Sequence, residues 1–219
     1  MAKIDHISRI RDLHHLVDGW RRAGETIALL PTMGALHEGH LSLARIGKAR
    51  CRRLVASVFV NPAQFAATED FSTYPRTLET DLAKLSALGC DLVWAPAANT
   101  MYPDGFATSI VPQGAASGLE ADYRSQFFTG VATVCCKLFS QIQPNIALFG
   151  EKDYQQLLII KRMVADFFMP IEIIGIPIVR ETDGLAMSSR NNYLNTEQRT
   201  IAPRLFQTLH EMKTKIESG

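Results

Sequence analysis

The sequence predicts an α/β protein of the doubly wound, Rossmann-like class, with helices on both faces of a parallel β-sheet, followed by the start of a small C-terminal domain. Three observations predict this class. Short apolar segments alternate with helical patterns along the chain. Most of these segments are continuous apolar runs, as in strands buried on both faces. Polar segments that contain glycine follow two of them. Such alternation implies right-handed crossovers between parallel strands.

Five segments have the apolar, β-branched composition of buried strands. They are residues 26–30, 54–60, 91–95, 145–149 and 171–179. Helical patterns lie between them, at residues 39–50, 77–88, 129–142 and 153–168. The helix over 77–88 has Thr77 as a candidate N-cap and Gly89 just past its end.

Composition excludes several classes of partner. The 219 residues carry a net charge of +1, with 47% hydrophobic and 21% charged residues. Binding to duplex nucleic acid usually requires a basic face, so we expect no nucleic-acid partner. The locally basic segment 9–22 fits the solvent-exposed face of a helix. No apolar run reaches the length of a membrane span, and no signal peptide is recognised at the N-terminus.

The four cysteines, Cys51, Cys90, Cys135 and Cys136, include no CxxC pair. Zinc ribbons and thioredoxin-like chemistry are therefore not indicated. We expect buried free thiols, which fits a cytoplasmic protein in a reducing compartment.

Two polar segments predict the position of the ligand site. Residues 31–40, "PTMGALHEGH", follow the strand at 26–30, and residues 150–156, "GEKDYQQ", follow the strand at 145–149. In open α/β sheets, ligands bind beyond the carboxyl ends of the strands, where the strand order reverses. If these two strands are neighbours, the two segments face each other across a crevice. Long loops at 61–75 and 96–128 are further candidates for functional segments.

The HxGH segment favours binding of phosphate. Gly34 permits a tight turn after the strand, and Gly39 leaves room for a flat ligand close to the helix start. His37 and His40, three residues apart, lie on one face of the first helical turn. That turn presents free N–H groups and partial positive charge. A loop with two structural histidines is the simpler alternative, and zinc would require a third ligand that is not found nearby. Neither GxxxxGK[ST] nor GxGxxG occurs in the sequence.

Two further segments suit a polyphosphate. Ser188, Ser189 and Arg190 place two hydroxyls and a guanidinium in one short loop. Lys152 closely follows the strand at 145–149. A helix-capping loop and an ordinary surface lysine are the alternatives for these residues. The three phosphate-binding patterns together are more informative than any of them alone.

Taken together, the motifs resemble one family along essentially the whole chain. The sequence is similar to pantothenate synthetases, the pantoate–β-alanine ligases, which belong to the HxGH nucleotidyltransferase superfamily. The resemblance rests on "PTMGALHEGH", "FVNPAQF" at 59–65, "YPRTLETDL" at 74–82, "GVATVCCKLF" at 130–139, "FGEKDYQQL" at 149–157 and "DGLAMSSRNNYL" at 183–194. It implies a homodimeric enzyme that condenses pantoate with β-alanine, using ATP with Mg²⁺, through a pantoyl adenylate.

The resemblance also implies roles for individual residues. His40 matches the residue assigned as catalytic proton donor, Gln64 the glutamine that binds pantoate and β-alanine, and Gln156 a second pantoate contact. The residues that match the ATP site are Met33, Gly34, Ala35, Leu36, His37, Glu38, Gly39, His40, Gly150, Glu151, Lys152, Asp153, Val179, Met187, Ser188, Ser189 and Arg190.

Physical chemistry agrees with this allocation. Adenylation builds negative charge around the α-phosphorus, so we expect four groups to oppose it as catalytic residues: His37, His40, Lys152 and Arg190. An acyl adenylate also needs protection from water, and the 61–75 loop with Tyr74 is our candidate lid. Asp81 is either a Mg²⁺ ligand or an exposed helix carboxylate.

Two departures from the family pattern modify these expectations. Family members commonly have His–Phe before "GVxTV", whereas this chain has Phe127–Phe128, so no substrate role is carried over to residue 127. The resemblance also implies two domains, a nucleotide- and pantoate-binding domain at residues 1–176 and the beginning of a lid domain at residues 177–219. Family members usually continue several dozen residues past position 219, which suggests a truncated lid domain. We therefore expect residues 188–190 to be poorly held and turnover to be slow. The alternatives are a nucleotidyltransferase for another small acid and a nucleotide-binding remnant without catalysis.

Overall fold

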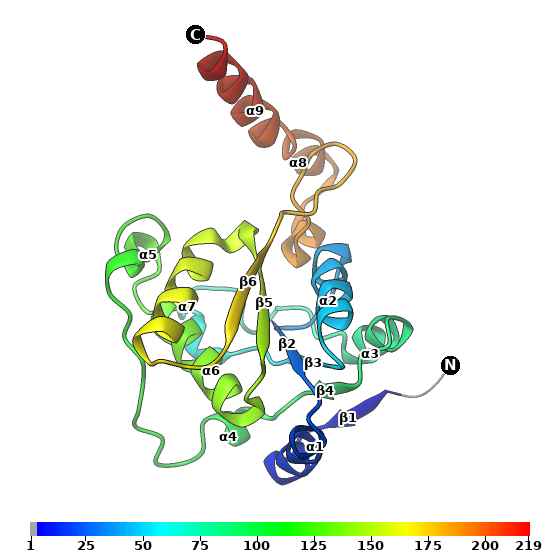
Figure 1. The fold of residues 1–219 in the computed structure, drawn as a ribbon. Coiled ribbons are helices and arrows are strands. Elements are labelled where there is room, and N and C mark those ends of the chain that lie inside the picture. Colours follow the sequence, from blue (N-terminus) through cyan, green and yellow to red (C-terminus); the bar gives the residue numbers. More distant parts are fainter. Residues whose placement is uncertain (1–3) are drawn as a thin grey trace.

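The computed structural model describes residues 4–219 and contains a parallel sheet of six strands (Figure 1). The strands are β1 (Asp5–Ile7), β2 (Ile27–Thr32), β3 (Arg53–Val58), β4 (Leu92–Trp94), β5 (Ile146–Gly150) and β6 (Glu172–Ile176). Their order in the sheet is β1-β4-β3-β2-β5-β6. Every neighbouring pair is parallel, which confirms the predicted fold class.

Helices cover both faces of the sheet. The longer ones are α1 (Ile10–Arg22), α2 (Glu38–Arg50), α3 (Leu78–Ala87), α6 (Phe127–Ile142), α7 (Tyr154–Asp166) and α9 (Arg204–Glu217). Short ones are α4 (Ala98–Met101), α5 (Glu120–Tyr123) and α8 (Thr196–Ile201). Single 3₁₀ segments are η1 (Pro62–Gln64), η2 (Gly114–Ala116), η3 (Glu151–Asp153) and η4 (Ser189–Tyr193).

Alternate residues of each central strand enter two separate cores. In β2, Ile27 and Leu29 pack in the core formed with α1, α6 and α7. Ala28 and Leu30 pack in the core formed with α2 and α3. This is the period of two expected of a strand whose two faces are both buried. The result is a three-layer arrangement in which the sheet separates the two groups of helices (Figure 1).

The predicted strands and longer helices agree closely with the observed ones, with some differences. The predicted loop 96–128 contains the short helices α4 and α5. The strand predicted at 171–179 ends at Ile176, because the next residue, Pro177, has no N–H to donate to the sheet. β1 was missed, because three residues are too short for a recognisable pattern. Thr77 stands at the N-cap position of α3, but its hydroxyl donates to Asp81 rather than capping the helix.

The strand order reverses between β2 and β5. The chain moves from β2 outward through β3 and β4, then returns to the other side of β2 with β5. Leu29 pairs with Ala147 across this junction, so the predicted neighbourhood of the two strands is confirmed. The segments that follow β2 and β5 therefore leave the same edge of the sheet beside each other, at the position expected for a ligand in this fold.

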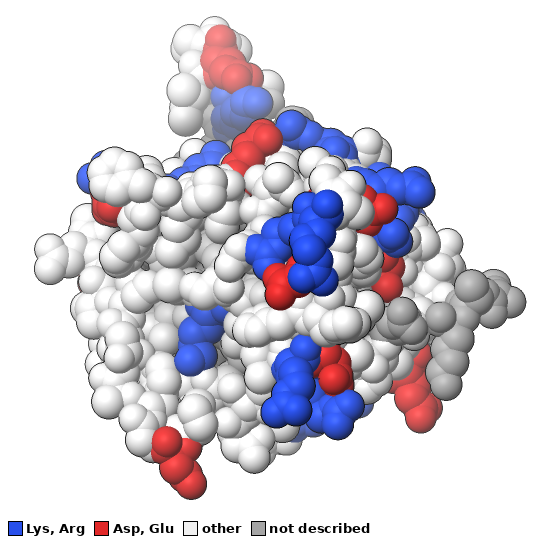
Figure 2. All heavy atoms as spheres, turned by 60° about the horizontal axis from the view of Figure 1, so that its bottom comes forward, with Lys and Arg blue, Asp and Glu red and all other residues white. Residues whose placement is uncertain are grey.

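The surface carries charges of both signs, and the C-terminal helices project from it. On the face seen in Figure 2, Lys and Arg side chains lie next to Asp and Glu side chains at several places. α8 and α9 extend away from the layered body (Figure 1). α9 carries an exposed apolar stripe of Leu205, Leu209, Met212 and Ile216. Within residues 4–219, none of the helices has the length and apolar character that crossing a membrane would require.

One close contact links the fold to the site. Gly130 of α6 lies directly against η1, where an added Cβ would overlap the Ala63 carbonyl group and lie 2.8 Å from the Gln64 Cα atom. Asn61 also donates its side-chain N–H to the Gly130 carbonyl at 3.1 Å. The absence of a side chain at Gly130 thus lets η1 pack on α6. This packing fixes the position of the Gln64 backbone.

We predict that Gly130→Ala lowers the free energy of unfolding by about 1–3 kcal/mol, the usual cost of overpacking, because the obstructing atoms belong to backbone. Gly19→Ala is the matched control. It lies in α1 with no atom within 4 Å of its would-be Cβ, so the better helix propensity of Ala should raise stability by about 0.5–1 kcal/mol. Urea denaturation of both variants measures these changes. If both substitutions changed the free energy of unfolding by the same amount, the close contact at Gly130 would be contradicted.

Candidate active site

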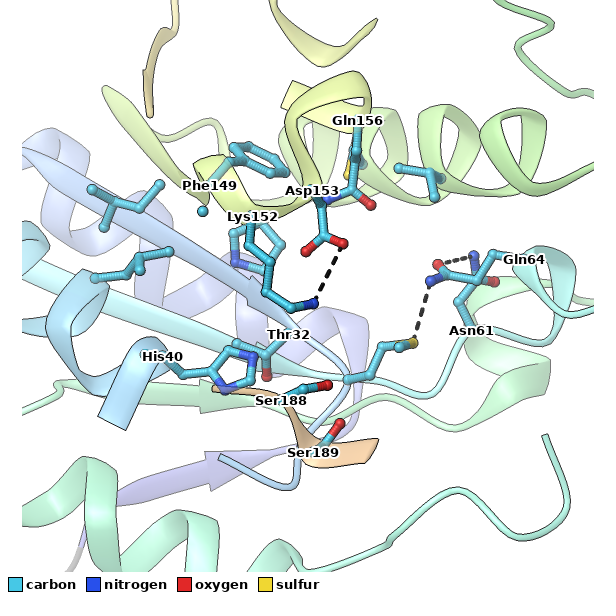
Figure 3. Close-up of a pocket in the computed structure, with 18 of the residues that line it drawn as sticks. Thr32, His40, Asn61, Gln64, Phe149, Lys152, Asp153, Gln156, Ser188 and Ser189 are labelled. Carbon is cyan, nitrogen blue, oxygen red and sulfur yellow. Dashed lines mark hydrogen bonds and ion pairs between the residues drawn. The ribbon is translucent and has the colours of Figure 1, made fainter. Parts of the chain in front are cut away.

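A cavity lies at the carboxyl ends of β2 and β5, and most of the residues predicted from sequence line it (Figure 3). Side chains from several parts of the chain point into this space, among them His40, Lys152 and Ser188 (Figure 3). The predicted residues that line the cavity are Met33, His37, Gly39, His40, Gln64, Gly150, Lys152, Asp153, Gln156, Val179, Met187, Ser188, Ser189 and Arg190.

The turn after β2 has an unusual backbone. Gly34 has a φ of +88° and Ala35 a φ of +51°, so two successive residues adopt left-handed conformations. Glycine accommodates this conformation without cost, whereas Ala35 is strained there. The Ala35 and Leu36 N–H groups donate to the two carboxylate oxygens of Asp81, at 2.9 and 2.8 Å. The predicted tight turn is therefore present and is held by a side chain from α3.

Asp81 does not fit either role considered from the sequence. Its side chain is fully buried, so it is not an exposed helix carboxylate. It accepts two backbone N–H groups and the Thr77 hydroxyl, and it is not among the residues that line the cavity. A carboxylate already engaged in this way is poorly placed to bind a metal ion carried by a nucleotide. We therefore do not retain Asp81 as a Mg²⁺ ligand.

The described residues do not form a cluster of metal ligands elsewhere either. Across 4–219, no group of three or more His, Cys, Asp or Glu side chains could hold a metal ion. Zinc ligation by the two histidines therefore lacks a third ligand in the described part of the chain as well. Mg²⁺ often keeps several waters and binds through phosphate oxygens, so it does not need a complete set of protein ligands.

The two histidines form a close pair at the start of α2. Their ring centroids are 4.1 Å apart, and the His37 backbone N–H donates to His40 Nδ1 at 3.3 Å. A Cβ on Gly39 would lie 2.8 Å from His37 Cε1, so the absence of a side chain makes room for the His37 ring, and Gly39 itself lines the cavity. The glycine of the HxGH motif thus permits the histidine pair itself.

Both imidazoles are neutral in this environment. Burial lowers the pKa of His37, and the nearby Lys152 and Lys84 lower it further, against an opposing effect of Asp153. Burial, His37 and the same two lysines lower the pKa of His40 to about 3. Since His40 Nδ1 accepts a hydrogen bond, the proton of its neutral ring is on Nε2. His40 therefore offers one N–H donor without carrying a charge, whereas His37 Nδ1 is buried and has no partner among the described residues.

A second turn, after β5, supplies a cation. Lys152 of η3 lines the cavity and makes a long ion pair of 3.8 Å with Asp153. Its side chain is 40% exposed, so most of its charge is available to a ligand. The turns after β2 and β5 therefore present two neutral imidazoles and an ammonium group to the same cavity.

The loop that contains Ser188, Ser189 and Arg190 is firmly held, contrary to the expectation from sequence. Ser189 is buried, and its hydroxyl lies 3.0 Å from the Tyr74 hydroxyl. Arg190 binds Asp70 through two N–H groups, both at 3.0 Å, and Tyr193 donates to the same carboxylate at 3.1 Å. Asp70 and Tyr74 both belong to the 61–75 loop that we predicted as a lid. Two loops far apart in sequence are thus joined beside the cavity.

Gln64 is oriented by Asn61. Asn61 is buried and donates an N–H to Gln64 Oε1 at 3.0 Å, while its own oxygen accepts from the Tyr102 hydroxyl at 2.7 Å. Gln64 Nε2 then points toward Met33, with its nitrogen 3.3 Å from the sulfur (Figure 3). The sulfur is a weak acceptor, so this amide N–H remains available to a better one. Gln156 also lines the cavity, from the first turn of α7.

A charged group at one end of the cavity was not predicted from the sequence. Arg124 lies 3.6 Å above the Phe127 ring and donates to Glu69 at 2.5 and 2.8 Å and to Glu120 at 2.7 Å. Arg124, Glu120 and Phe127 all line the cavity. The phenylalanine at position 127 thus packs against the guanidinium of Arg124. This cluster joins segments too far apart in sequence for a motif to reveal it.

Several residues predicted for the ATP site do not line the cavity. Glu38 pairs with Arg45 on the exposed side of α2. Leu36 is buried in the core between the sheet and α2. Glu151 lies against Gly175 of β6. Together with Gly34 and Ala35, these residues shape the two turns rather than the cavity wall.

Comparison with known proteins shows which family the chain is similar to. Residues 5–218 match the model of the family described as pantoate-beta-alanine ligase. The pantothenate synthetase of Rhodospirillum rubrum is 54% identical over 210 residues, which cover 96% of this chain and 74% of that protein. The pantothenate synthetase of a Bradyrhizobium species is 50% identical over 100% of this chain and 78% of its own length.

Solved structures give the same result. The pantothenate synthetase of Thermus thermophilus superposes with a TM-score of 0.94 at 45% identity, over 99% of this chain and 77% of that one. The Francisella tularensis enzyme, solved in complex with beta-gamma ATP and beta-alanine, has a TM-score of 0.90 at 36% identity, over 98% of this chain and 85% of that one. With its histidine pair at the start of α2 and its cavity between the ends of β2 and β5, the chain belongs to the pantoate–β-alanine ligase family.

Proposed function

We propose that the cavity catalyses both half-reactions of pantothenate synthesis through a pantoyl adenylate. A pantoate carboxylate oxygen attacks the α-phosphorus of ATP, an O–P bond forms, and pyrophosphate leaves. The β-alanine nitrogen then attacks the acyl carbon, the C–N bond forms, AMP leaves, and the nitrogen loses a proton. The observation that carries this proposal is the convergence of His40, Lys152 and Arg190 on one cavity with Gln64 and Gln156.

The first test is pyrophosphate release with ATP, Mg²⁺ and pantoate, followed by AMP and pantothenate release when β-alanine is added. Release only with a different carboxylic acid would indicate another nucleotidyltransferase. ATP binding without any pyrophosphate release would indicate a nucleotide-binding protein that lacks catalysis. Either result would contradict the proposed reaction.

Within this proposal, His37, His40, Lys152 and Arg190 stabilise charge that develops around the α-phosphorus. The neutral His40 ring would donate its Nε2–H to a phosphoryl oxygen, and Lys152 would bring a full charge. Gln64 and Gln156 would bind pantoate, and Gln64 would also contact β-alanine. The remaining cavity-lining residues predicted from sequence, from Met33 to Ser189, would surround the nucleotide.

We further propose a homodimeric, cytoplasmic enzyme that uses Mg²⁺ with ATP, with a domain boundary at residue 176 and a lid function for residues 177–219. The end of β6 at Ile176 supports the boundary. All four cysteines are free thiols, three of them buried and Cys136 half-buried, which supports a reducing compartment. Mg²⁺ would supply charge neutralisation on the phosphates, without a set of protein ligands.

We predict that His40→Ala lowers the rate of adenylation by about 10²–10³, the usual effect of removing one preorganised donor. Single-turnover formation of pantoyl adenylate, followed by acid quench, measures the rate. His15→Ala is a matched control, because His15 lies at an exposed position of α1 and does not line the cavity. A rate near that of the unchanged protein for His40→Ala would exclude the donor role.

We predict that Gln64→Ala weakens pantoate binding by about 1.5–3 kcal/mol, the range for a hydrogen bond to a charged group, and leaves ATP binding almost unchanged. The reason is that Asn61 orients the Gln64 amide so that its N–H is free for a carboxylate oxygen. Isothermal titration with each ligand separately measures both affinities. If ATP and pantoate lost equal affinity, Gln64 would have to be a structural residue of η1.

We predict that Asp70→Asn tightens ATP binding by about 5-fold or more. The triphosphate must displace residue 70 from Arg190, and an ionised aspartate holds the guanidinium more strongly than a neutral asparagine does. The Arg190 guanidinium holds the pKa of Asp70 below its usual range, so the carboxylate is ionised at neutral pH. Asp183→Asn, which loses an ion pair with Arg199 outside the cavity, is the control. Weaker ATP binding by Asp70→Asn would mean that Asp70 assists phosphate binding instead.

A further inference from the structure

One helix outside the HxGH and GEKD motifs makes direct contact with the backbone of the turn after β2. Asp81 and Lys84 lie three residues apart on α3 and therefore on the same face of that helix. The Asp81 carboxylate accepts the N–H groups of Ala35 and Leu36, and the Lys84 ammonium donates to the carbonyl of Leu36 at 2.5 Å. One acid and one base thus bind complementary groups of the same turn.

These contacts replace hydrogen bonds that the turn cannot make for itself. With left-handed backbone at Gly34 and Ala35, the N–H groups of residues 35 and 36 are not part of a helix or strand. Asp81 is fully buried, so its charge is compensated by these N–H groups and by the Thr77 hydroxyl rather than by water. Because a buried N–H group without a partner is costly, the strained turn depends on this carboxylate.

The contacts also fix the position of the histidine pair. Leu36 directly precedes His37. Asp81 accepts the N–H of Leu36, and Lys84 donates to its carbonyl. His37 is the N-cap of α2, and its own N–H binds the His40 ring. A shift of the turn therefore moves both the His37 ring and the donor that selects the tautomer of His40.

We propose that Asp81 and Lys84 are positioning residues for adenylation: from one face of α3 they hold the backbone of residues 35–36 so that the His37–His40 pair keeps its catalytic placement. The inference rests on the proposed function of the cavity. It assigns to α3 a role in the reaction although neither residue lines the cavity. Neither side chain needs to touch a substrate for this role.

The charge of Lys84 also supports the neutral form of the two histidines. The charged groups that act on the histidines are Lys84 from α3 and Lys152 and Asp153 from η3. The two lysines lower the pKa of both imidazoles, and Asp153 raises that of His37. Lys84 thus helps to keep the rings neutral while it holds the turn.

The decisive experiment is a double-mutant cycle of Asp81→Asn with His40→Ala. Asparagine keeps the shape of Asp81 but turns an NH₂ group toward a backbone N–H. We expect Asp81→Asn alone to lower kcat for pyrophosphate release by about 10- to 100-fold, the scale of a misplacement of about 1 Å, with a smaller change in KM for ATP. In the His40→Ala background we expect less than about 3-fold further loss, because the residue that Asp81 positions is already absent.

Glu79→Gln is the matched control, since it removes the same charge from an exposed position of α3. We expect wild-type kcat for this variant. Thermal unfolding of every variant separates loss of fold from loss of placement. If Asp81→Asn lowers the melting temperature but the folded enzyme keeps wild-type kcat, or if its effect multiplies fully with that of His40→Ala, Asp81 is only a structural residue and the inference is wrong.

Lys84→Met keeps the inference testable even if Asp81→Asn does not fold, because Lys84 is only half-buried. We expect its kcat to fall by about 10-fold and the NMR titrations of the His37 and His40 rings to move to higher pKa, since a nearby cation is removed. Unchanged kcat together with unchanged titrations would overturn the role of Lys84. If the unchanged protein does not release pyrophosphate with pantoate, the proposed function fails, whereas the histidine titrations still report whether α3 controls the pair.

Discussion

The pairing of β2 with β5 is the constraint on which the rest of the site depends. These strands lie far apart in sequence and meet only because the chain returns past β2 after building β3 and β4. Their pairing places two turns at one edge of the sheet, and no local interaction could bring those turns together. Side chains from both faces of the strands enter separate cores, so the register cannot slip without moving every apolar residue to the wrong face.

Most of the architecture could be predicted from the sequence because it depends on local patterns. Continuous apolar runs predicted the central strands. The first strand was too short to predict, and Pro177 ended β6 earlier than its apolar composition suggested. The motif residues could be placed around one cavity because motifs that follow neighbouring strands necessarily converge.

What could not be predicted are contacts between segments that have no common pattern. Asp81 was interpreted from its side-chain chemistry alone, as a metal ligand or an exposed carboxylate. Its actual partners are backbone N–H groups some 45 residues earlier in the chain, which no sequence motif specifies. Arg190 is a similar case. Its firm attachment to Asp70 depends on the path of the 61–75 loop, and no local pattern indicates that a carboxylate would lie there.

The distribution of charge along the cavity follows from these long-range contacts. Lys152 at the end of β5 has a long ion pair, and the two imidazoles beside it are neutral. Arg190 is matched by one carboxylate, and Arg124, at the Phe127 end, by two. Positive charge is therefore least compensated at Lys152, where the ends of β2 and β5 meet, and most compensated at Arg124.

This gradient favours different ligands at the two ends. A polyanion such as a triphosphate is favoured where the positive charge is least compensated. The group of Arg124, Glu69 and Glu120 has two carboxylates for one guanidinium, so it favours a ligand with a positively charged group over a polyanion. How completely each cation is paired, and not how many cations line the cavity, therefore determines which end of the cavity favours an anion.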